Sequence, residues 1–258
     1  MNDAIQTVNW PAPAGIRAGY TTRHGGVSEP PFDTLNLGDH VGDGVQAVAS
    51  NRQRLAQWVG CRPVFLQQVH GTAVVTIDAQ TPDGIEADAS LSTQTGVACV
   101  VLVADCLPVL LTSADGRVVA AAHAGWRGLA GRDGRGVIEV LVERIHAMFA
   151  LRQAPELMAW LGPCIGPTAF EVGPDVVAAF GPEARLCFRP GRSDRHYWAD
   201  LPALARQRLR ACGVAQIFGN DGSPSWCTWT RGADFFSYRR DRVCGRQSAW
   251  IARVAAAV

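Results

Sequence analysis

The sequence predicts one α/β domain over residues 1–258, in which helices cover a mixed β core. The composition supports one large core, because 48% of the 258 residues are apolar and only 18% are charged. Helical and strand-like segments follow one another irregularly, unlike the regular alternation of a doubly wound sheet. No linker rich in proline, glycine or serine, no charge run and no internal repeat divides the chain.

Strands are expected where short apolar or alternating segments are bounded by turn residues. Residues 97 to 122 are rich in valine and apolar on both strand faces, which indicates a buried sheet. Around this centre the expected strands are 15–23, two extended pieces of 65–77 joined at His70 and Gly71, 157–161, 214–218, 234–239 and 247–254.

Helices are expected where apolar residues recur at three- and four-residue spacing, because this spacing places them on one face. The segments with that spacing are about 45–59, 130–150, 174–181 and 200–212. Their apolar faces can cover the β core from outside, which gives the predicted architecture.

The segment 103–128 predicts a β-hairpin that brings two reactive side chains together. An Asp-Gly pair at 115–116 is a strong turn signal between two apolar runs. A two-residue turn there pairs His123 with Pro108. Cys106 and His123 are then diagonal neighbours on one face, close enough to act on a common atom.

A third residue of this kind is His70, which ends an extended segment directly before a glycine. Two histidines and one cysteine at strand ends match catalytic zinc sites, where three protein ligands leave a fourth position for water or substrate. The residues also allow other interpretations. Cys106 and His123 can be core residues or a thiol nucleophile with its base. A closed structural zinc site would need a fourth ligand, which Cys164 can supply.

Charge and composition exclude several classes of function. The net charge of +1 gives no reason to expect a nucleic-acid or membrane-surface partner. The chain has no lysine, so Schiff-base, Ser-Lys and P-loop lysine mechanisms are excluded. The N-terminus lacks the features of a secretory signal, and no apolar run is long enough to span a bilayer. We therefore expect a soluble, cytoplasmic protein whose eight cysteines are reduced thiols.

Nine blocks of the sequence carry a family resemblance: RHGGVSEPPFDTLNLGDHVGD, NRQRLA, QQVHG, ADASLST, ADCLPVLL, AAHAGWRG, LGPCIGPTAFEVG, DLPALARQRL and FFSYRRDRVCGRQSAWI. In order, from about residue 17 to 253, they resemble the bacterial laccase-domain family. Members of that family are labelled polyphenol oxidase, purine nucleoside phosphorylase or peptidoglycan editing factor. The ADCLPVLL and AHAGWRG blocks are the most specific of the nine.

The resemblance implies a single-domain α/β/β/α sandwich with mixed β-sheets. It also implies a zinc ion bound by His70, Cys106 and His123. The implied activity is phosphorolysis of adenosine, inosine and methylthioadenosine, together with deamination of adenosine. The sequence departs from the family pattern at Arg242, where the family usually has glycine or another small residue.

These reactions give further residues candidate roles. Phosphorolysis passes through a cationic sugar, so the site must hold phosphate near the anomeric carbon. Arginines suit this task through bidentate contacts, and the candidates are Arg52, Arg127, Arg239 and Arg240. Zinc with an open position activates water for deamination, and the proton carriers expected there are Asp105 and Glu171. Cys164 is also counted among the substrate-binding candidates.

Three alternatives stand beside the zinc enzyme. Cys106 and His123 suffice for acyl chemistry, as in an amidase that edits peptidoglycan precursors. Copper in the open site would give polyphenol oxidase activity, although a true multicopper laccase calls for about ten histidines and this chain has six. A structural-zinc binding module is the non-enzyme alternative. We expect a monomer that binds purine nucleoside and phosphate, with no nucleic-acid or membrane partner.

Overall fold

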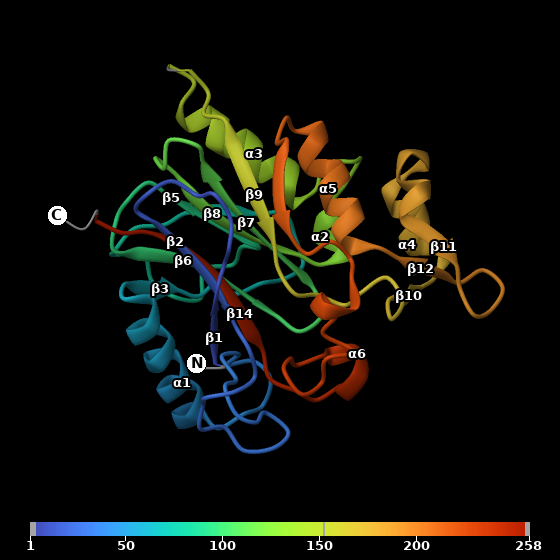
Figure 1. Cartoon of the computed structure of the whole chain (residues 1–258), viewed down its shortest axis with the longest axis horizontal. Helices are drawn as coiled ribbons and strands as arrows, with labels where there is room; N and C mark the ends of the chain where they lie inside the picture. The colour runs from blue at the N-terminus through green and yellow to red at the C-terminus, as the bar shows by residue number, and fades with distance from the viewer. Residues whose placement is uncertain (1–3, 152, 256–258) are drawn as a thin grey trace.

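Two large β-sheets lie face to face, and helices cover both outer faces (Figure 1). The computed structural model describes residues 4–151 and 153–255. One sheet has five strands, in the order β1 (Ile5–Thr7), β2 (Ile16–Thr21), β14 (Gln247–Arg253), β6 (Val97–Val103) and β3 (Arg62–Val64). The other has six, in the order β13 (Gln216–Gly219), β9 (Leu157–Leu161), β7 (Leu107–Ser113), β8 (Val119–Ala124), β5 (Ala89–Ser92) and β4 (Val74–Thr76). Both sheets are mixed, so the predicted α/β/β/α sandwich is confirmed.

The central strands are apolar on both faces because each face packs against a different layer. Every residue of β6, β7 and β8 is buried. On β7, Leu110 packs between the two sheets with Trp160 and Ile251. Val109 and Leu111 point to the opposite face and join the core under the helices. Burial on both faces explains why this part of the sequence is continuously apolar.

One long helix covers the five-stranded sheet, and two cover the six-stranded sheet (Figure 1). The first is α1 (Val45–Val59), which packs its apolar face against Trp250 and its neighbours. The other two are α3 (Val137–Met148) and α5 (Leu201–Ala211). The helix expected at 130–150 begins only at Val137, as α3, because the short helix α2 (Trp126–Ala130) before it ends at Gly131, which has a φ of 65°. Only glycine adopts that conformation without strain.

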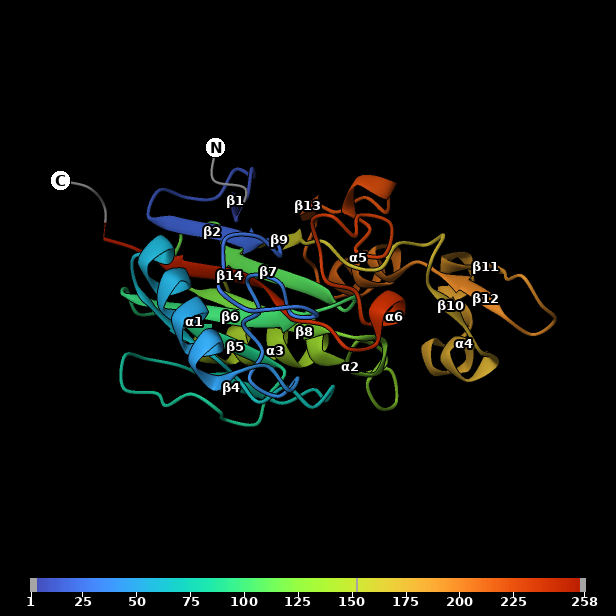
Figure 2. The same ribbon diagram turned by 90° about the horizontal axis from the view of Figure 1, so that it is seen from below.

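A lobe at one end of the molecule carries a third, three-stranded sheet (Figure 2). Its strands follow the order β10 (Glu171–Val172), β12 (Tyr197–Ala199) and β11 (Phe188–Pro190). Helix α4 (Pro174–Phe180) and a 3₁₀ turn (Pro182–Cys187) complete it. The sequence predicts α4 but none of the three strands, because each is only two or three residues long.

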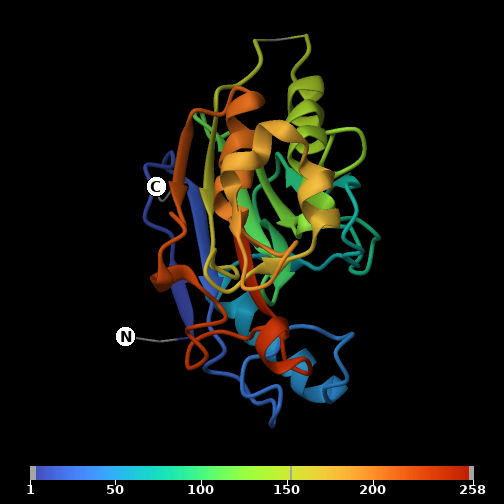
Figure 3. The same ribbon diagram turned by 90° about the vertical axis from the view of Figure 1, so that its right-hand side faces the viewer.

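The prediction of a strand at 234–239 is wrong. Phe235 and Phe236 lie in a loop, and a short helix, α6 (Tyr238–Asp241), follows them. Ser237 caps this helix by accepting a hydrogen bond from the N–H of Arg240 (3.3 Å). The two phenylalanines are buried without belonging to a sheet, so their apolarity indicated burial rather than extended pairing. In Figure 3, α6 lies beneath the lobe.

The first extended piece of 65–77 is also not a strand. Its one β-bridge pairs Gln67 with Glu86, and only β4 follows it as a strand. The hairpin register, in contrast, is confirmed, because β7 and β8 pair Pro108 with His123.

Within the described ranges, no helix is long and apolar enough to cross a membrane.

Arg242 occupies a backbone conformation that suits glycine better than a residue with a side chain. Its φ is 63° and its ψ is −60°. The N–H of Val243 donates to the carbonyl of Asp241 (2.7 Å), which closes a γ-turn over Arg242. This γ-turn with positive φ is strained for residues that have a side chain.

We expect Arg242→Gly to stabilise the protein. Relief of about 1–3 kcal/mol of backbone strain exceeds the entropy cost of a glycine, about 0.5–1 kcal/mol. The melting temperature should therefore rise by about 2–4 °C for a net gain near 1 kcal/mol. Arg242→Ala is the matched control, because it removes the guanidinium but keeps the strain. A stabilisation by alanine equal to that by glycine would contradict this explanation.

Candidate metal centre

His70, Cys106 and His123 come together at the edge of the six-stranded sheet. Cys106 directly precedes β7, His123 lies near the end of β8, and His70 lies in the loop before β4. All three ligand atoms lie within 4.8 Å of one another, and Cys106 Sγ is 3.8 Å from His70 Nε2. Tetrahedral zinc with bonds of 2.0–2.3 Å would bring such atoms about 3.4–3.6 Å apart. In the part of the chain that the structure describes, this is the one group of three or more side chains able to hold a metal.

The exposure of the three side chains argues against a plain core role. His123 is buried, Cys106 is half-buried and His70 is exposed. The group therefore begins in the sheet and opens toward solvent, and a ligand can reach it. Cys164 is not part of the group, since its buried thiol lies beside the side-chain amide of Asn220 (3.3 Å). The structure thus brings together three ligands rather than the four of a closed structural zinc site.

Asp88, which lies directly before β5, fixes the two histidines. Its carboxylate is fully buried and lies 2.8 Å from Nδ1 of His123. This contact leaves Nε2 of His123 for a metal, as carboxylate partners do in zinc sites. The same carboxylate accepts hydrogen bonds from the N–H groups of Val69 (3.2 Å), His70 (2.9 Å) and Gly71 (2.6 Å). It therefore also holds His70 at a φ of 61°.

Glycines next to the cluster allow its side chains to meet. A Cβ on Gly125 would lie 3.0 Å from both Cys106 Sγ and the His70 ring. A Cβ on Gly128 would lie 2.7 Å from the carbonyl oxygen of Gly71. The missing side chains at these glycines leave room for the side chains of the cluster and for its loop. Any larger residue at 125 would push His70 away from Cys106.

The electrostatics of the cluster favour a thiolate. Burial alone would raise the pKa of the Cys106 thiol, but its interactions with His123 and His70 lower it to about 6. Burial likewise opposes the charged form of His123, yet the Cys106 thiolate and Asp88 raise its pKa to about 9. Asp88 is buried too, and its bonds to His123 and to backbone N–H groups hold its pKa below the ordinary value. A thiolate is the form in which cysteine binds a metal.

The cluster forms part of the wall of a cavity of about 460 Å³, a size suited to a small molecule. Its remaining wall is partly apolar and partly cationic. Other residues that line it are His40, Gln68, Leu102, Val103, Ala104, Asp105, Trp126, Arg127, Ile165, Phe170, Leu201, Tyr238, Arg239 and Arg246.

Asp105 lines the cavity but is also bound to the protein. One carboxylate oxygen accepts from the hydroxyl of Thr228 (2.7 Å) and the other from the N–H of Arg239 (2.6 Å). Asp105 has a φ of 89°, and its carbonyl accepts from the N–H of Ile165 (2.9 Å). It therefore joins Cys106, the next residue, to the loop that carries α6.

Four predicted site residues do not line the cavity. Arg52 pairs with Asp39 (3.1 Å) beside α1. The Glu171 carboxylate accepts from the N–H of Arg192 (2.6 Å) in the lobe. Cys164 is buried behind the cavity wall.

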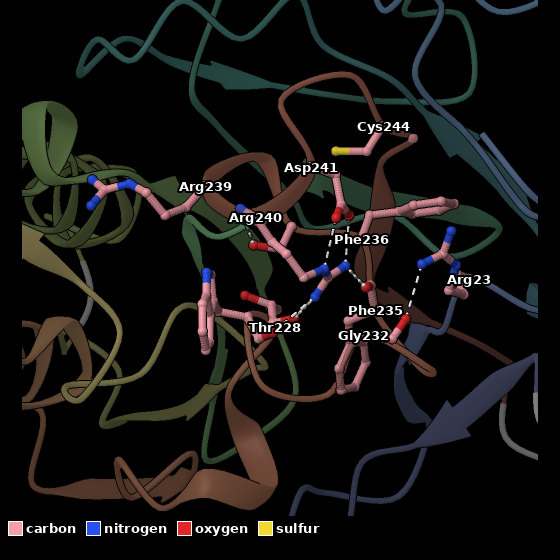
Figure 4. Close-up of polar contacts among 12 residues, drawn as sticks. Arg23, Thr228, Gly232, Phe235, Phe236, Arg239, Arg240, Asp241 and Cys244 are labelled. Atoms are coloured by element: carbon pink, nitrogen blue, oxygen red, sulfur yellow. Dashed lines mark hydrogen bonds and ion pairs between the residues drawn. The ribbon is translucent and has the colours of Figure 1, made fainter. Parts of the chain in front are cut away.

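Arg240 is the fourth, and its guanidinium holds the loop before α6 together (Figure 4). It donates to the carbonyls of Thr228 (2.7 Å) and Phe235 (2.9 Å). It also pairs with Asp241 (2.7 Å). Among the predicted arginines, only Arg127 and Arg239 line the cavity.

The sequence analysis missed Asp88 and Arg246. Asp88 stands in the ADASLST block, directly before a buried strand, but nothing local separates it from an aspartate that caps a turn. Arg246 stands in the block that also contains Arg239, but nothing in its spacing separates it from a surface arginine. Both become visible only when distant segments are placed side by side.

Fold and site define an α/β/β/α protein with an open, three-residue group able to bind a metal. Over residues 17–254 the chain matches a family model described as multi-copper polyphenol oxidoreductase laccase, and it belongs to that family.

Two curated relatives are named purine nucleoside phosphorylase. One, from Pseudomonas aeruginosa, is 48% identical over 252 residues, which cover 96% of this chain and 98% of the relative. The other, YfiH of Escherichia coli, is 47% identical over 246 residues, which cover 94% and 96%.

Two solved structures have the same fold. A Neisseria meningitidis protein matches with a TM-score of 0.85 and 45% identity, over 98% of this chain and 100% of the other. YlmD from Geobacillus stearothermophilus matches with a TM-score of 0.88 and 33% identity, over 98% and 97%.

We expect Asp88→Asn to weaken metal binding about 10–100-fold, the usual effect of losing a ligand's carboxylate partner. The amide keeps the shape of the side chain, but its NH₂ group cannot accept from the donors that surround it. Metal affinity can be measured by competition with a chromogenic chelator. Asp115→Asn, at the exposed β7–β8 turn, is the matched control. An affinity of Asp88→Asn within threefold of the unchanged protein would show that this carboxylate does not orient the ligands.

Proposed function

We propose that the protein is a zinc-dependent purine nucleoside phosphorylase that also deaminates adenosine. The observation that carries the proposal is the open His–Cys–His group in the wall of a cavity that also holds arginines without carboxylate partners. The names of the two curated relatives support the phosphorylase activity. The substrates would be adenosine, inosine and methylthioadenosine with inorganic phosphate.

The donor set fits zinc. One thiolate and two imidazoles are common zinc ligands, and Asp88 supplies the carboxylate partner that such sites use. When bound, the ion would supply a Lewis acid with one position open to water or substrate. Copper also accepts these donors. A multi-copper centre has no support, since the described residues offer a single group and the whole chain has six histidines.

In phosphorolysis, a phosphate oxygen forms a bond to the anomeric carbon while the glycosidic bond to the purine breaks. The purine leaves with the bonding electrons and takes up a proton, which yields ribose 1-phosphate and the free base. Guanidinium groups in the cavity would hold phosphate, while Trp126 and Phe170 offer apolar faces to the flat purine. The chain's contribution is therefore mainly position and charge.

In deamination, water adds to the amino-bearing carbon of adenine and ammonia leaves. A proton must leave the water and another must reach the amine. Of the two predicted proton carriers, Asp105 lines the cavity and Glu171 does not. Each Asp105 oxygen retains a lone pair beyond the hydrogen bond it accepts. We therefore propose Asp105 for this role.

A second candidate is a thiol hydrolase, such as an amidase acting on peptidoglycan precursors. Asp88, His123 and Cys106 follow one another as the carboxylate, base and nucleophile of a triad would. The low pKa of Cys106, about 6, favours this alternative. His70 has no role in such a triad, however, whereas in a metal centre it is the third ligand.

Incubation with adenosine tests the proposal. Adenine and ribose 1-phosphate should form only when phosphate is present, with ribose 1-phosphate equal to the sum of adenine and hypoxanthine, and inosine should form without phosphate. His70→Ala should lose both reactions because the metal loses one ligand. Adenine release that does not depend on phosphate would indicate hydrolysis, and full activity of His70→Ala would contradict a three-ligand metal centre. The products can be separated and measured by liquid chromatography.

A further inference from the structure

The arginines that line the cavity lack the carboxylate partners that the predicted arginines outside it have. Arg127, Arg239 and Arg246 line the cavity, and within residues 4–151 and 153–255 none of them forms an ion pair with a carboxylate. Arg52 and Arg240, which lie outside it, each have one. The only carboxylate in the cavity wall is Asp105, whose oxygens already accept two hydrogen bonds. The wall therefore carries uncompensated positive charge, which favours an anionic ligand.

Arg239 is held in place by contacts that leave part of its guanidinium unused. Nη1 donates to the carbonyl of Glu171 (2.8 Å), and the group lies over the ring of Phe170, 5.3 Å from its centroid. Its backbone N–H is bound to Asp105, so both ends of the residue are fixed. In Figure 4 the side chain extends away from the Arg240 network. Its Nε–H and Nη2–H form no hydrogen bond to the described chain.

Arg246 is held in the same way by a different part of the chain. Nη1 donates to the carbonyls of Cys244 (3.0 Å) and Gly245 (3.0 Å). The stem lies on the loop before α1, where a Cβ on Gly38 would be 2.8 Å from its Cγ. The backbone N–H donates to the side-chain oxygen of Asn36 (2.9 Å). Its Nε–H and Nη2–H likewise find no protein acceptor among the described residues.

Arg127 is placed differently. It is exposed, its side chain forms no hydrogen bond to the described protein, and its guanidinium lies only over the ring of its neighbour Trp126 (4.5 Å). Such a side chain can attract anions to the cavity but is not fixed for one position. A fixed guanidinium loses less conformational entropy when it binds.

We infer that Arg239 and Arg246, which line the same cavity, together form the binding site for the phosphate dianion. In each residue the free Nε–H and Nη2–H make up one edge of the guanidinium. This edge matches two oxygens of a phosphate in a bidentate contact. The inference rests on the proposed function, because it identifies the residues that hold the second substrate of phosphorolysis. It adds Arg246 and removes Arg52 and Arg240 from the candidates.

Calorimetric titration of the zinc-loaded protein with inorganic phosphate tests the site without depending on activity. Arg239→Met and Arg246→Met should each weaken phosphate binding at least tenfold. Arg239→Lys and Arg246→Lys keep the charge but lose the paired donors, so they should fall between methionine and arginine. Arg117→Met is the matched control, because Arg117 lies at the β7–β8 turn and pairs with Asp115. It should bind phosphate like the unchanged protein. Melting curves show whether each variant is folded.

Kinetics separate this site from the proposed function. The KM for phosphate should rise at least tenfold in both methionine variants, whereas Arg117→Met should leave the KM for phosphate and the deamination of adenosine unchanged. If the unchanged protein binds phosphate but has no phosphorylase activity, and the variants lose phosphate binding, the anion site is supported and the proposed function is refuted. Folded methionine variants that bind phosphate as tightly as the unchanged protein would overturn the site.

Discussion

The buried carboxylate of Asp88 joins three parts of the chain that must meet before a metal can bind. One oxygen lies 2.8 Å from His123 on β8, and both accept N–H groups from the loop that carries His70. A buried carboxylate is costly unless its oxygens have partners, and here all its partners belong to the metal centre. The site is thus built into the edge of the sheet, and its geometry follows from the pairing of β5 with β8.

Asp105 connects this centre to the rest of the cavity. It precedes Cys106 of the group able to bind a metal, and its carboxylate accepts hydrogen bonds from Thr228 and from the backbone N–H of Arg239. The metal position and the proposed phosphate position therefore share one rigid connection. Arg240 stabilises the same loop from the other side, through the carbonyls of Thr228 and Phe235. It does not line the cavity.

The parts of the structure that the sequence predicts are those set by local rules. The apolar spacing places α1 at its observed bounds, and the Asp-Gly turn fixes the register that pairs Pro108 with His123. The three ligands follow from that register and from the family resemblance. The short strands of the lobe escape prediction because two or three residues carry no periodicity. The strand prediction is wrong at Phe235 and Phe236 because a buried loop and a buried strand both require apolar residues.

Of the candidate site, the sequence predicts the three residues that can bind a metal but not the residues that hold them in place. Asp88 and Arg246 act through contacts with residues far away in the sequence, to His123 and to Asn36. Nothing local distinguishes a buried aspartate with four partners from one that caps a turn. Arg52 and Arg240 were predicted to bind substrate because their motifs contain several arginines. Only the fold shows which guanidinium lines the cavity.

X-ray absorption at the zinc edge of the zinc-loaded protein tests most directly the central claim, that His70, Cys106 and His123 bind one ion with an open fourth position. We expect one sulfur at about 2.3 Å and two imidazole nitrogens at about 2.0–2.1 Å, with a further light atom from solvent. Zinc bound by two sulfurs, or by none, would contradict the account. So would a spectrum that stays unchanged in Cys106→Ser.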